Sequence, residues 1–556
     1  MYQSKFLIPT LKEAPKDAQI FSHGHLIRAG YIKQSAAGLY TYLPLAQRSL
    51  RKIEQVVREE IDKIGGAEMS MPLMQPTELW EQSGRLENYD EGNMFMMTDR
   101  HGRKFAMSPT AEEATVDVVR SHLNSYKKYP LNVYQINTKF RDERRPRFGL
   151  LRSREFTMFD GYSFHTDEEC LNNTYNDYYE AYKRILDRLE IDYRIVTADN
   201  GSMGGSMSQE FMAISEIGED TIAYEEGTDI AYNVETAPIA NVYSKQTSNS
   251  ELARVETPNI KTMEELTSFL NVDLKNTVKA VCYMIDSELV IAFCNGTRTI
   301  EETKLLRAVG GAEIESASNT MLADNNIAAG FIGPVGLENI RVVFDREVSM
   351  MSNFVCGANE VDYHLTGVDF DRDINSDQVF DICEVEEGDI MRSGGNPASL
   401  AKGIEIGHIF ALGDRYTSSM GMTFLDKDQK QATPVMGCYG IGISRILTAY
   451  VEQKQIDGTV RFGEAVSPFD YHLIVLDYAK NEEQANFANE VAKKLRAQGK
   501  TVLIDDRNER VGSKMIDAEL IGCTNQIVIG RDFSEGIVEV KNGKEKTKVN
   551  VEELYA

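Results

Sequence analysis

Two arginine-bearing segments, far apart in the sequence, predict that a polyphosphate is held from two sides. The first lies in residues 140–143 (FRDE) and 152–156 (RSREF), and the second lies in residues 436–445 (MGCYGIGISR). Arginine keeps its positive charge in proteins, and its planar fork of donors matches the oxygens of a phosphate group. The sequence has neither a GxxxxGKS/T phosphate loop nor a GxGxxG motif that opens a predicted helix. The pattern therefore favours a nucleoside triphosphate that binds in another way.

Length and composition indicate a globular protein of several domains. The chain has 556 residues, of which 42% are hydrophobic and 26% are charged, which suggests roughly three or four domains of about 150 residues each. No apolar stretch reaches the length of a membrane span, and the first residues lack an apolar signal core. We therefore expect a cytoplasmic protein with no membrane partner. The seven cysteines are scattered without a CxxC pair, so neither a disulfide framework nor a zinc site is expected.

The overall charge restricts how RNA could bind. A formal net charge of −26 opposes general binding of polyanions, so an RNA partner would have to meet a local basic face. One basic run spans sixteen positions and contains only two acidic residues. A solvated, charged hairpin explains this run equally well. Its basic residues are Lys139, Arg141, Arg144, Arg145, Arg147, Arg152 and Arg154.

Several elements that must position these arginines can be predicted. Apolar residues recur at helical spacing from Leu50 to Ile64, and Gly65 and Gly66 follow, which predicts an amphipathic helix and its end. Residues 67–72 then alternate like a strand that a proline closes. This helix and strand are typical of a dimer element, although an ordinary helix packed on a sheet fits as well.

The arginine-rich loop is predicted to be the tip of a hairpin. Residues 133–140 and 156–164 read as its two strands. A helix follows, and its aromatic stripe indicates a core face rather than a cofactor site. That stripe consists of Tyr178, Tyr179, Tyr182, Ile185 and Leu189.

An inserted domain and a C-terminal α/β unit complete the predicted organisation. Between residues 224 and 401 the composition becomes acidic and rich in Asn, and sheet-like sequence resumes at residues 403–410 (GIEIGHIF). The insertion therefore interrupts one domain. From residue 468, strand-like segments alternate with helical ones, which predicts a partly parallel sheet flanked by helices.

Five motifs in this order resemble those of the bacterial-type prolyl-tRNA synthetases, a family of class II aminoacyl-tRNA synthetases with an editing insertion. They lie at residues 138–143, 145–152, 160–164, 403–412 and 436–445. The resemblance implies a multidomain α/β and α+β fold. A class II antiparallel-sheet catalytic core would occupy residues 1–223 and 403–465, an inserted α+β editing domain residues 224–402, and an α/β anticodon-binding domain residues 466–556. It also implies a homodimer.

The resemblance assigns ATP-binding roles to seven residues. Arg141 would contact the α-phosphate and stabilise charge as the amino-acid carboxylate attacks it, and Arg445 would hold the γ-phosphate. Both are the expected catalytic residues. Magnesium would bind at Glu405 and bridge phosphate oxygens. The other members of the set would read or stack the adenine, contact a phosphate, or lie near the adenylate: Glu143, Phe156, Arg152 and His408.

The implied proline pocket contains both family residues and departures from the family pattern. Thr110 and Glu112 would lie near the imino group, with Cys438 on the pocket wall. Relatives usually carry histidine at the positions of Ala111 and Gln209, and lysine at the position of Phe159. Three such changes around one pocket could alter the choice of amino acid. Drift in a working enzyme is favoured, because Arg141, Arg445 and Cys438 are intact.

Editing and tRNA binding are implied for three further groups of residues. The insertion resembles a domain that hydrolyses alanine wrongly attached to proline tRNA. Such editing is needed because alanine is smaller than proline and can enter the proline pocket with only a modest loss of binding energy. Its site would contain Lys279, Gly330, Pro334, Asp345 and His364. Acceptor-stem contacts would come from Arg144, Arg145 and Arg147. Anticodon contacts would come from Arg507, Arg510 and Lys514.

The sequence thus predicts ATP-dependent ligation of proline to tRNA(Pro) through a prolyl-adenylate, with hydrolytic editing of mischarged alanyl-tRNA. Two alternatives remain open at this point. A paralogue could activate a different small amino acid, or the chain could be a catalytically silent RNA-binding or regulatory relative. Intact Arg141, Glu143 and Arg445 count against the silent relative, because it would have no need of a phosphate clamp.

Overall fold

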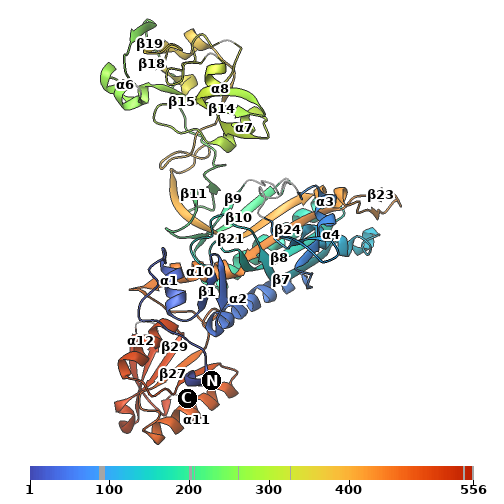
Figure 1. Cartoon of the computed structure of the whole chain (residues 1–556), viewed down its shortest axis with the longest axis vertical. Helices are drawn as coiled ribbons and strands as arrows, with labels where there is room; N and C mark the ends of the chain where they lie inside the picture. Colours follow the sequence, from blue (N-terminus) through green and yellow to red (C-terminus); the bar gives the residue numbers. More distant parts are fainter. Residues whose placement is uncertain are drawn as a thin grey trace. The chain divides into compact units, whose positions relative to one another are not determined.

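The computed structural model divides the chain into two compact units (Figure 1). The larger unit comprises Met1–Ile195, Asp199–Asp220 and Lys402–Ala556, and the smaller one comprises Val196–Ala198 and Thr221–Ala401. The structure describes residues 1–86, 94–198, 203, 205, 207–260, 262–325, 327–337, 339–542 and 545–553. Each unit is considered by itself.

An antiparallel sheet forms the centre of the larger unit, as the class II resemblance implies. Its strands are β7 (Leu131–Phe140), β8 (Glu155–His165), β10 (Met207–Ile214), β21 (Ala398–Gly413) and β24 (Val435–Gly442). The hydrogen-bonded order is β10–β21–β24–β8–β7, and β3 (Ala67–Glu68) adds a parallel pairing beside β7. The predicted hairpin of β7 and β8 is confirmed, whereas the strand predicted at residues 67–72 is only two residues long.

Helices α5 (Glu168–Arg188) and α10 (Ile443–Gln453) pack on this sheet, and α2 (Pro44–Lys63) packs on both of these helices. Helices α2 and α10 are labelled in Figure 1. The predicted helix from Leu50 is confirmed and begins at Pro44, because proline is favoured in a first helical turn. The aromatic stripe of α5 is core, as predicted. Tyr178 and Tyr182 are fully buried, and the Tyr178 ring stacks on Tyr439 with centroids 3.5 Å apart.

A small subassembly of the larger unit carries part of the candidate site. It contains β4 (Met74–Pro76), β5 (Met96–Thr98) and β6 (Lys104–Met107), and the mutually packed helices α3 (Thr77–Ser83), α4 (Glu112–Val119) and α9 (Arg415–Ser419). Gly84 ends α3 in the left-handed region (φ 74°), where glycine carries no Cβ penalty.

The C-terminal segment is the α/β unit that the sequence predicts. Its elements are β27 (Tyr471–Val475), α11 (Glu482–Ala497), β28 (Val502–Asp505), α12 (Val511–Ile521), β29 (Asn525–Ile529), β30 (Ile537–Asn542) and β31 (Glu545–Asn550). Strands β28, β27 and β29 are parallel, and β30 and β31 continue the sheet as an antiparallel hairpin.

The smaller unit has an α+β architecture with its own buried clusters. Strands β14 (Val278–Ile285), β15 (Glu288–Asn295), β16 (Ile314–Ser316), β17 (Arg341–Asp345) and β20 (Val379–Phe380) form one mixed sheet, and β13 (Ala253–Glu256), β18 (Ser352–Gly357) and β19 (Tyr363–Asp369) form another. Helices α6 (Met263–Leu270), α7 (Glu302–Val309) and α8 (Asn319–Asp324) accompany these sheets.

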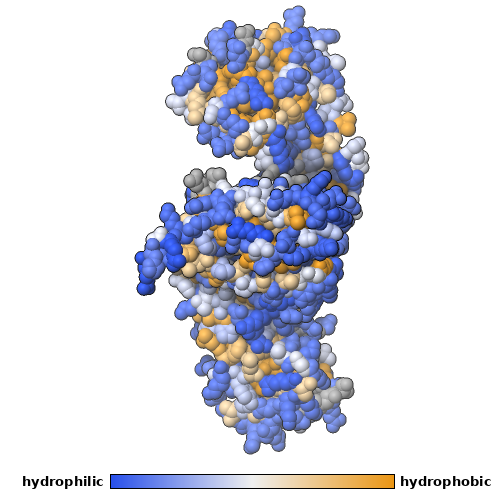
Figure 2. All heavy atoms as spheres, turned by 90° about the vertical axis from the view of Figure 1, so that its right-hand side faces the viewer, coloured by the Kyte–Doolittle hydropathy of each residue, from blue (hydrophilic) through white to orange (hydrophobic). Residues whose placement is uncertain are grey.

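Polar side chains cover most of the face drawn in Figure 2, and apolar side chains show there mainly in small patches. Among the described ranges, no helix combines the length and apolar character needed to cross a membrane.

A buried histidine makes the stability of the C-terminal sheet sensitive to acid. His472 on β27 is fully buried, and its Nε2 lies 3.1 Å from Gln3 Oε1. Burial lowers the pKa of His472 from 6.5 to about 4, with a partly opposing effect of Asp505. The unfolded chain therefore takes up a proton first, so stability present above pH 6.5 is lost as the pH falls toward 4.

We expect the free energy of unfolding to fall by up to about 3 kcal/mol over this window because of His472. Thermal unfolding midpoints at pH 7, 6 and 5 would measure the loss. His472→Gln removes the titrating group, so this variant should lose less on acidification. Equal losses in both proteins would contradict the assignment.

Candidate active site

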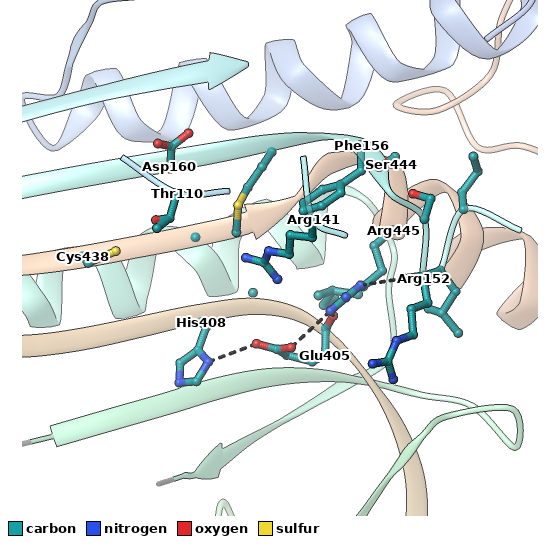
Figure 3. Close-up of a pocket in the computed structure, with 18 of the residues that line it drawn as sticks. Thr110, Arg141, Arg152, Phe156, Asp160, Glu405, His408, Cys438, Ser444 and Arg445 are labelled. Atoms are coloured by element: carbon teal, nitrogen blue, oxygen red, sulfur yellow. Dashed lines mark hydrogen bonds and ion pairs between the residues drawn. The ribbon is translucent and has the colours of Figure 1, made fainter. Parts of the chain in front are cut away.

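A cavity of about 230 Å³ opens on the antiparallel sheet of the larger unit. All ten residues predicted to bind ATP or proline line it, with Arg141 and Arg445 at one part and Thr110 and Cys438 at another (Figure 3). The structure thus brings together residues from strands β8, β21 and β24, from the loop between β7 and β8, from the first turn of α10, and from the start of α4 and the segment before it. The full set is Thr110, Glu112, Arg141, Glu143, Arg152, Phe156, Glu405, His408, Cys438 and Arg445.

Strand alternation explains which side chains enter the cavity. On β8, Phe156, Met158 and Asp160 line it, because successive side chains of a strand point to opposite faces. On the neighbouring strand β24, Gly440 has no side chain and so leaves space for the Met158 side chain. A Cβ atom added there would lie 2.8 Å from the Met158 side chain.

Arginines and their partners occupy the end of the cavity where the sequence predicts the nucleotide. The Arg141 guanidinium lies over the Phe156 ring, with 5.2 Å between Cζ and the ring centroid. Arg445 Nη1 donates to the Glu405 carbonyl at 2.6 Å and lies 3.1 Å from its carboxylate (Figure 3). Arg152 Nε donates to Glu143 Oε2 at 2.7 Å.

Glu405 is an ionised carboxylate between cationic neighbours. Burial opposes its ionisation, but the hydrogen bond with His408 and the charges of Arg445 and Arg141 lower the pKa of Glu405 to about 2. His408 Nδ1 lies 3.0 Å from Glu405 Oε1 and 3.8 Å from Glu210 Oε1. Ligand atoms of these three residues lie within 4.8 Å of one another. Glu210 was not predicted as a site residue.

A second carboxylate lies at the end of the cavity where the sequence predicts proline. Glu112 is fully buried and accepts hydrogen bonds from Thr110 Oγ1 at 2.7 Å, Cys438 Sγ at 3.2 Å and Arg85 Nη1 at 3.2 Å. Burial and the adjacent Glu112 charge raise the pKa of Cys438, so its thiol keeps its proton and donates. Arg85 was missed by sequence reasoning.

Asp160 is another buried carboxylate of the cavity wall, beside Glu112. Its Oδ2 accepts from Tyr162 Oη at 2.8 Å and Gln135 Nε2 at 2.9 Å, and its Oδ1 pairs with Lys139 Nζ at 2.8 Å. Lys139 is fully buried, so its interpretation as part of a basic surface is wrong. The alternation of side chains along β7 could have predicted this burial, because Lys139 lies on the same face of the strand as the buried Gln135.

None of the three departures from the family pattern lines the cavity, and the side chains of Phe159 and Gln209 contact tyrosines that do not line it either. The Phe159 ring packs against Tyr134 and Tyr182, with centroids 5.3 and 6.4 Å apart, and Gln209 accepts a hydrogen bond from Tyr175 on α5 at 3.1 Å. The interpretation that these changes surround one pocket is therefore wrong for Phe159 and Gln209. Ala111 is buried, and its amide donates to Tyr162 Oη at 2.9 Å.

The predicted tRNA-binding residues occupy different environments. Arg144, Arg145 and Arg147 are exposed, and Arg147 Nε lies 2.6 Å from Glu219. Arg507 and Arg510 line a cavity of about 330 Å³ beside the ends of β27 and β28. Lys514 does not line it.

Lys514 is turned into the C-terminal domain. Its side chain is fully buried, and Nζ donates to the Val475 carbonyl at 2.5 Å and the Asp505 carbonyl at 3.3 Å. A tRNA base could be reached only if Nζ left these carbonyls.

The predicted editing residues are brought together only in part. Lys279, Gly330 and His364 line a cavity of about 240 Å³ in the smaller unit. Pro334 and Asp345 are not among its lining residues. The Asp345 carboxylate instead accepts the backbone amides of residues 347 and 382 at 3.0 and 3.3 Å. Burial lowers the pKa of His364, whose Nδ1 lies 2.7 Å from Thr257 Oγ1.

Comparison with known proteins identifies the family. The model of the tRNA synthetase class II core domain (G, H, P, S and T) matches residues 95–454, and the model of the anticodon binding domain matches residues 470–556. The proline–tRNA ligase of Ligilactobacillus salivarius is 45% identical over 562 residues, which cover 100% of this chain and 98% of that protein. The chain belongs to the proline–tRNA ligase family.

Other members and solved structures agree with this assignment. The proline–tRNA ligase of a Geobacillus species is 44% identical over 559 residues, covering 100% of this chain and 98% of that one. The Giardia lamblia prolyl-tRNA synthetase, solved with prolyl-adenylate, has a TM-score of 0.59 at 14% identity and covers 98% of this chain and 78% of its own. A Cryptosporidium parvum prolyl-tRNA synthetase, solved with halofuginone and AMPPNP, also has a TM-score of 0.59, at 13% identity, over 98% of this chain and 76% of that chain. At such low identity these two structures support the fold of the proline–tRNA ligase family.

Proposed function

We propose that this member of the proline–tRNA ligase family activates proline with ATP and transfers it to tRNA(Pro). The observation that carries the proposal is one cavity with arginines at its nucleotide end and the buried Glu112 carboxylate at its amino-acid end. The positive fork of arginine suits phosphate oxygens, and a buried anion suits a cationic imino group. Both substrates of the first reaction are thereby held in one space.

In the first step, the proline carboxylate attacks the α-phosphorus of ATP. A carboxylate–phosphorus bond forms and the bond to pyrophosphate breaks, with charge growing on the phosphate oxygens. Arg141 would stabilise that charge, and Arg445 would hold the γ-phosphate. No general base is needed, because the nucleophile is already ionised. Positioning and electrostatics can therefore supply the acceleration.

The remaining nucleotide contacts are assigned to residues of the same cavity. Glu143 would accept the adenine amino group, Phe156 would stack on the base, and Arg152 would contact a phosphate. Arg152 and Glu143 both line the cavity and form a hydrogen-bonded pair there, which supports these assignments.

Magnesium fits the carboxylates next to His408. Glu405 and Glu210 offer the oxygen ligands that Mg²⁺ prefers, whereas imidazole is a weaker ligand for it. Bound there with ATP, the ion would neutralise charge on the phosphate oxygens. Glu405 suits this role because its low pKa keeps the carboxylate ionised.

In the second step, the 3′-hydroxyl of the terminal tRNA ribose attacks the adenylate carbonyl and AMP leaves. The exposed Arg144, Arg145 and Arg147 would meet the acceptor stem. Arg507 and Arg510 would meet the anticodon loop, where base edges of single-stranded RNA are accessible. Lys514 would hold the strand ends beneath them through its carbonyl contacts.

The division of the chain follows the family pattern. Residues 1–223 and 403–465 would form the catalytic core, 224–402 the editing domain and 466–556 the anticodon-binding domain. We further propose a cytoplasmic homodimer, with α2 and the following short strand as the dimer element.

The cavity in the smaller unit is proposed to hydrolyse alanine mischarged onto proline tRNA. Lys279, Gly330 and His364 line it. We expect Lys279→Ala to leave proline charging intact and to slow the deacylation of alanyl-tRNA(Pro) by roughly 10²-fold, because a charged hydrogen-bond donor to the substrate is lost. Deacylation of purified alanyl-tRNA(Pro) would measure this.

Lys275→Ala is a matched control, since Lys275 is an exposed lysine that pairs with Asp273 at 3.1 Å and does not line the cavity. Unchanged deacylation by Lys279→Ala would remove Lys279 from the editing site.

Amino-acid-dependent exchange of labelled pyrophosphate into ATP, measured with all twenty amino acids, tests the main proposal. A dominant signal with proline and a weaker one with alanine are expected. A signal with another amino acid alone would indicate a repurposed ligase. Silence throughout would favour a non-catalytic relative.

A further inference from the structure

A buried arginine beside the amino-acid end of the cavity has no part in the function proposed above. Arg85 follows the left-handed Gly84, and its amide donates to the Trp80 carbonyl at 3.0 Å, which turns the chain back toward α4. Its side chain is only 3% exposed. Nη1 lies 3.2 Å from Glu112 Oε2 and 3.1 Å from Glu113 Oε1. One guanidinium nitrogen is thus shared by two consecutive buried carboxylates.

Aromatic rings fix the direction of the Arg85 side chain. Its Cζ lies 5.1 Å from the centroid of the Trp80 ring and 5.2 Å from that of Tyr416. Contacts of a planar guanidinium with aromatic rings orient it in a way that an ammonium group does not reproduce. The donor atoms of Arg85 are therefore aimed at the first turn of α4.

The two carboxylates face different surroundings. Glu112 lines the cavity and also accepts from Thr110 and Cys438, whereas Glu113 does not line it and accepts from Ser83 Oγ at 2.8 Å. Arg85 Nη1 donates to Oε2 of Glu112, whereas Oε1 of Glu112 accepts from Cys438 on the cavity side. Glu113 pairs with the same guanidinium from outside the cavity.

Burial would make both glutamates hard to ionise. It raises the pKa of each, but the charge of Arg85 and the Thr110 hydroxyl bring the pKa of Glu112 below its ordinary value. For Glu113, burial and the neighbouring Glu112 charge outweigh Arg85, and the pKa stays raised. The other ionisable groups that face Glu112 are Cys438 on β24, Tyr416 on α9 and Tyr162 on β8 with its partner Asp160, and burial keeps the thiol and both phenols neutral.

We propose that Arg85 is a positioning residue for amino-acid recognition, which keeps the Glu112 carboxylate charged and aimed into the cavity without touching the substrate. The inference rests on the proposed role of Glu112 as the anchor of the proline imino group. Loss of Arg85 should weaken proline binding and leave ATP binding unchanged, because the nucleotide end of the cavity has its own arginines.

The test must avoid leaving two buried carboxylates without a counter-charge, which could unfold the protein. Glu113→Gln therefore serves as the reference, and Arg85→Met is added to it, which keeps a long side chain between the rings. KM for proline and KM for ATP are measured by pyrophosphate exchange from pH 6 to pH 9, and thermal unfolding reports on the fold.

Relative to the reference, the double variant should have a higher KM for proline at pH 7. For each unit by which the pKa of Glu112 in that variant lies above 7, the ionised fraction falls, and KM rises, by roughly tenfold. KM for ATP should not change. Without Arg85, burial alone raises the pKa of Glu112, so KM for proline should also fall as the pH rises and the carboxyl loses its proton, whereas the reference should show little such dependence.

Equal KM values for proline in the two variants at every pH would overturn the proposal. A parallel rise of both KM values with a lower unfolding midpoint would also overturn it, because that pattern belongs to a purely structural residue. Glu112→Gln distinguishes a failure of the proposed Glu112 anchor from a failure of the proposed role of Arg85. If it leaves KM for proline unchanged, the proposed anchor itself fails; if it raises KM while the Arg85 comparison shows no difference, only the role of Arg85 fails.

Discussion

Arg141→Ala is expected to lower proline-dependent pyrophosphate exchange by about 10³-fold or more, which is the range found when an arginine that stabilises a phosphoryl transition state is lost. The Arg141 side chain lines the cavity between Glu405 and the Phe156 ring, over which its guanidinium lies at 5.2 Å. Its position on the cavity wall is the one that the proposed contact with a bound phosphate requires. Initial rates of exchange at saturating proline and ATP would measure the effect.

Arg152→Ala is the matched control for Arg141→Ala. Arg152 lines the same cavity, but its side chain is 39% exposed and is shared between Glu143 and Glu219. Solvent screens such a charge, so a loss of only about 10-fold is expected. Comparable losses in both variants, or a fully active Arg141→Ala enzyme, would contradict the assignment of Arg141 to the reacting phosphate.

Removing Arg445 should have the second largest effect. We expect Arg445→Ala to lower kcat/KM for ATP by roughly 10² to 10³-fold, because one phosphate ligand is lost and Glu405 loses a neutralising neighbour. Arg445 Nη1 donates to both the backbone and the side chain of Glu405. Pyrophosphate exchange at varied ATP concentrations would give kcat/KM.

KM for proline provides the internal control for Arg445→Ala. Glu112, Thr110 and Cys438 form a separate hydrogen-bonded group, so proline affinity should be largely kept. An Arg445→Ala variant that loses proline affinity and ATP affinity to the same extent would indicate a folding defect at the junction of β24 and α10.

Elements with local periodicity were predictable from sequence. Alternation gave β7 and β8, helical spacing gave α2, and the tyrosine stripe of α5 gave a buried face. These patterns depend only on residues that are close in sequence, so they can be recognised without knowing the tertiary structure. The arginines of the cavity were found through motif types and the family resemblance.

Residues whose neighbours come from distant segments were not predictable. Glu210 joins the site because β10 pairs with β21 in the register that places Glu210 opposite His408. Arg85 joins it because a left-handed glycine turns the chain after α3. Composition gave no indication of either contact. Lys139 was assigned to a basic surface because it begins a run of basic residues, although it also belongs to the alternating pattern of β7 and is buried there.

The order in which the strands of the central sheet become available during synthesis has a kinetic consequence. Residues 158–165 of β8 pair with residues 435–442 of β24, and the smaller unit lies between them in sequence. Such non-local pairing carries a loop-closure cost and forms slowly. While the ribosome makes the intervening residues, the nascent chain presents an open edge of β8, which is a site for chaperones or for misassociation. Early closure of the inserted unit around its own core would bring the two strands nearer and shorten that exposure.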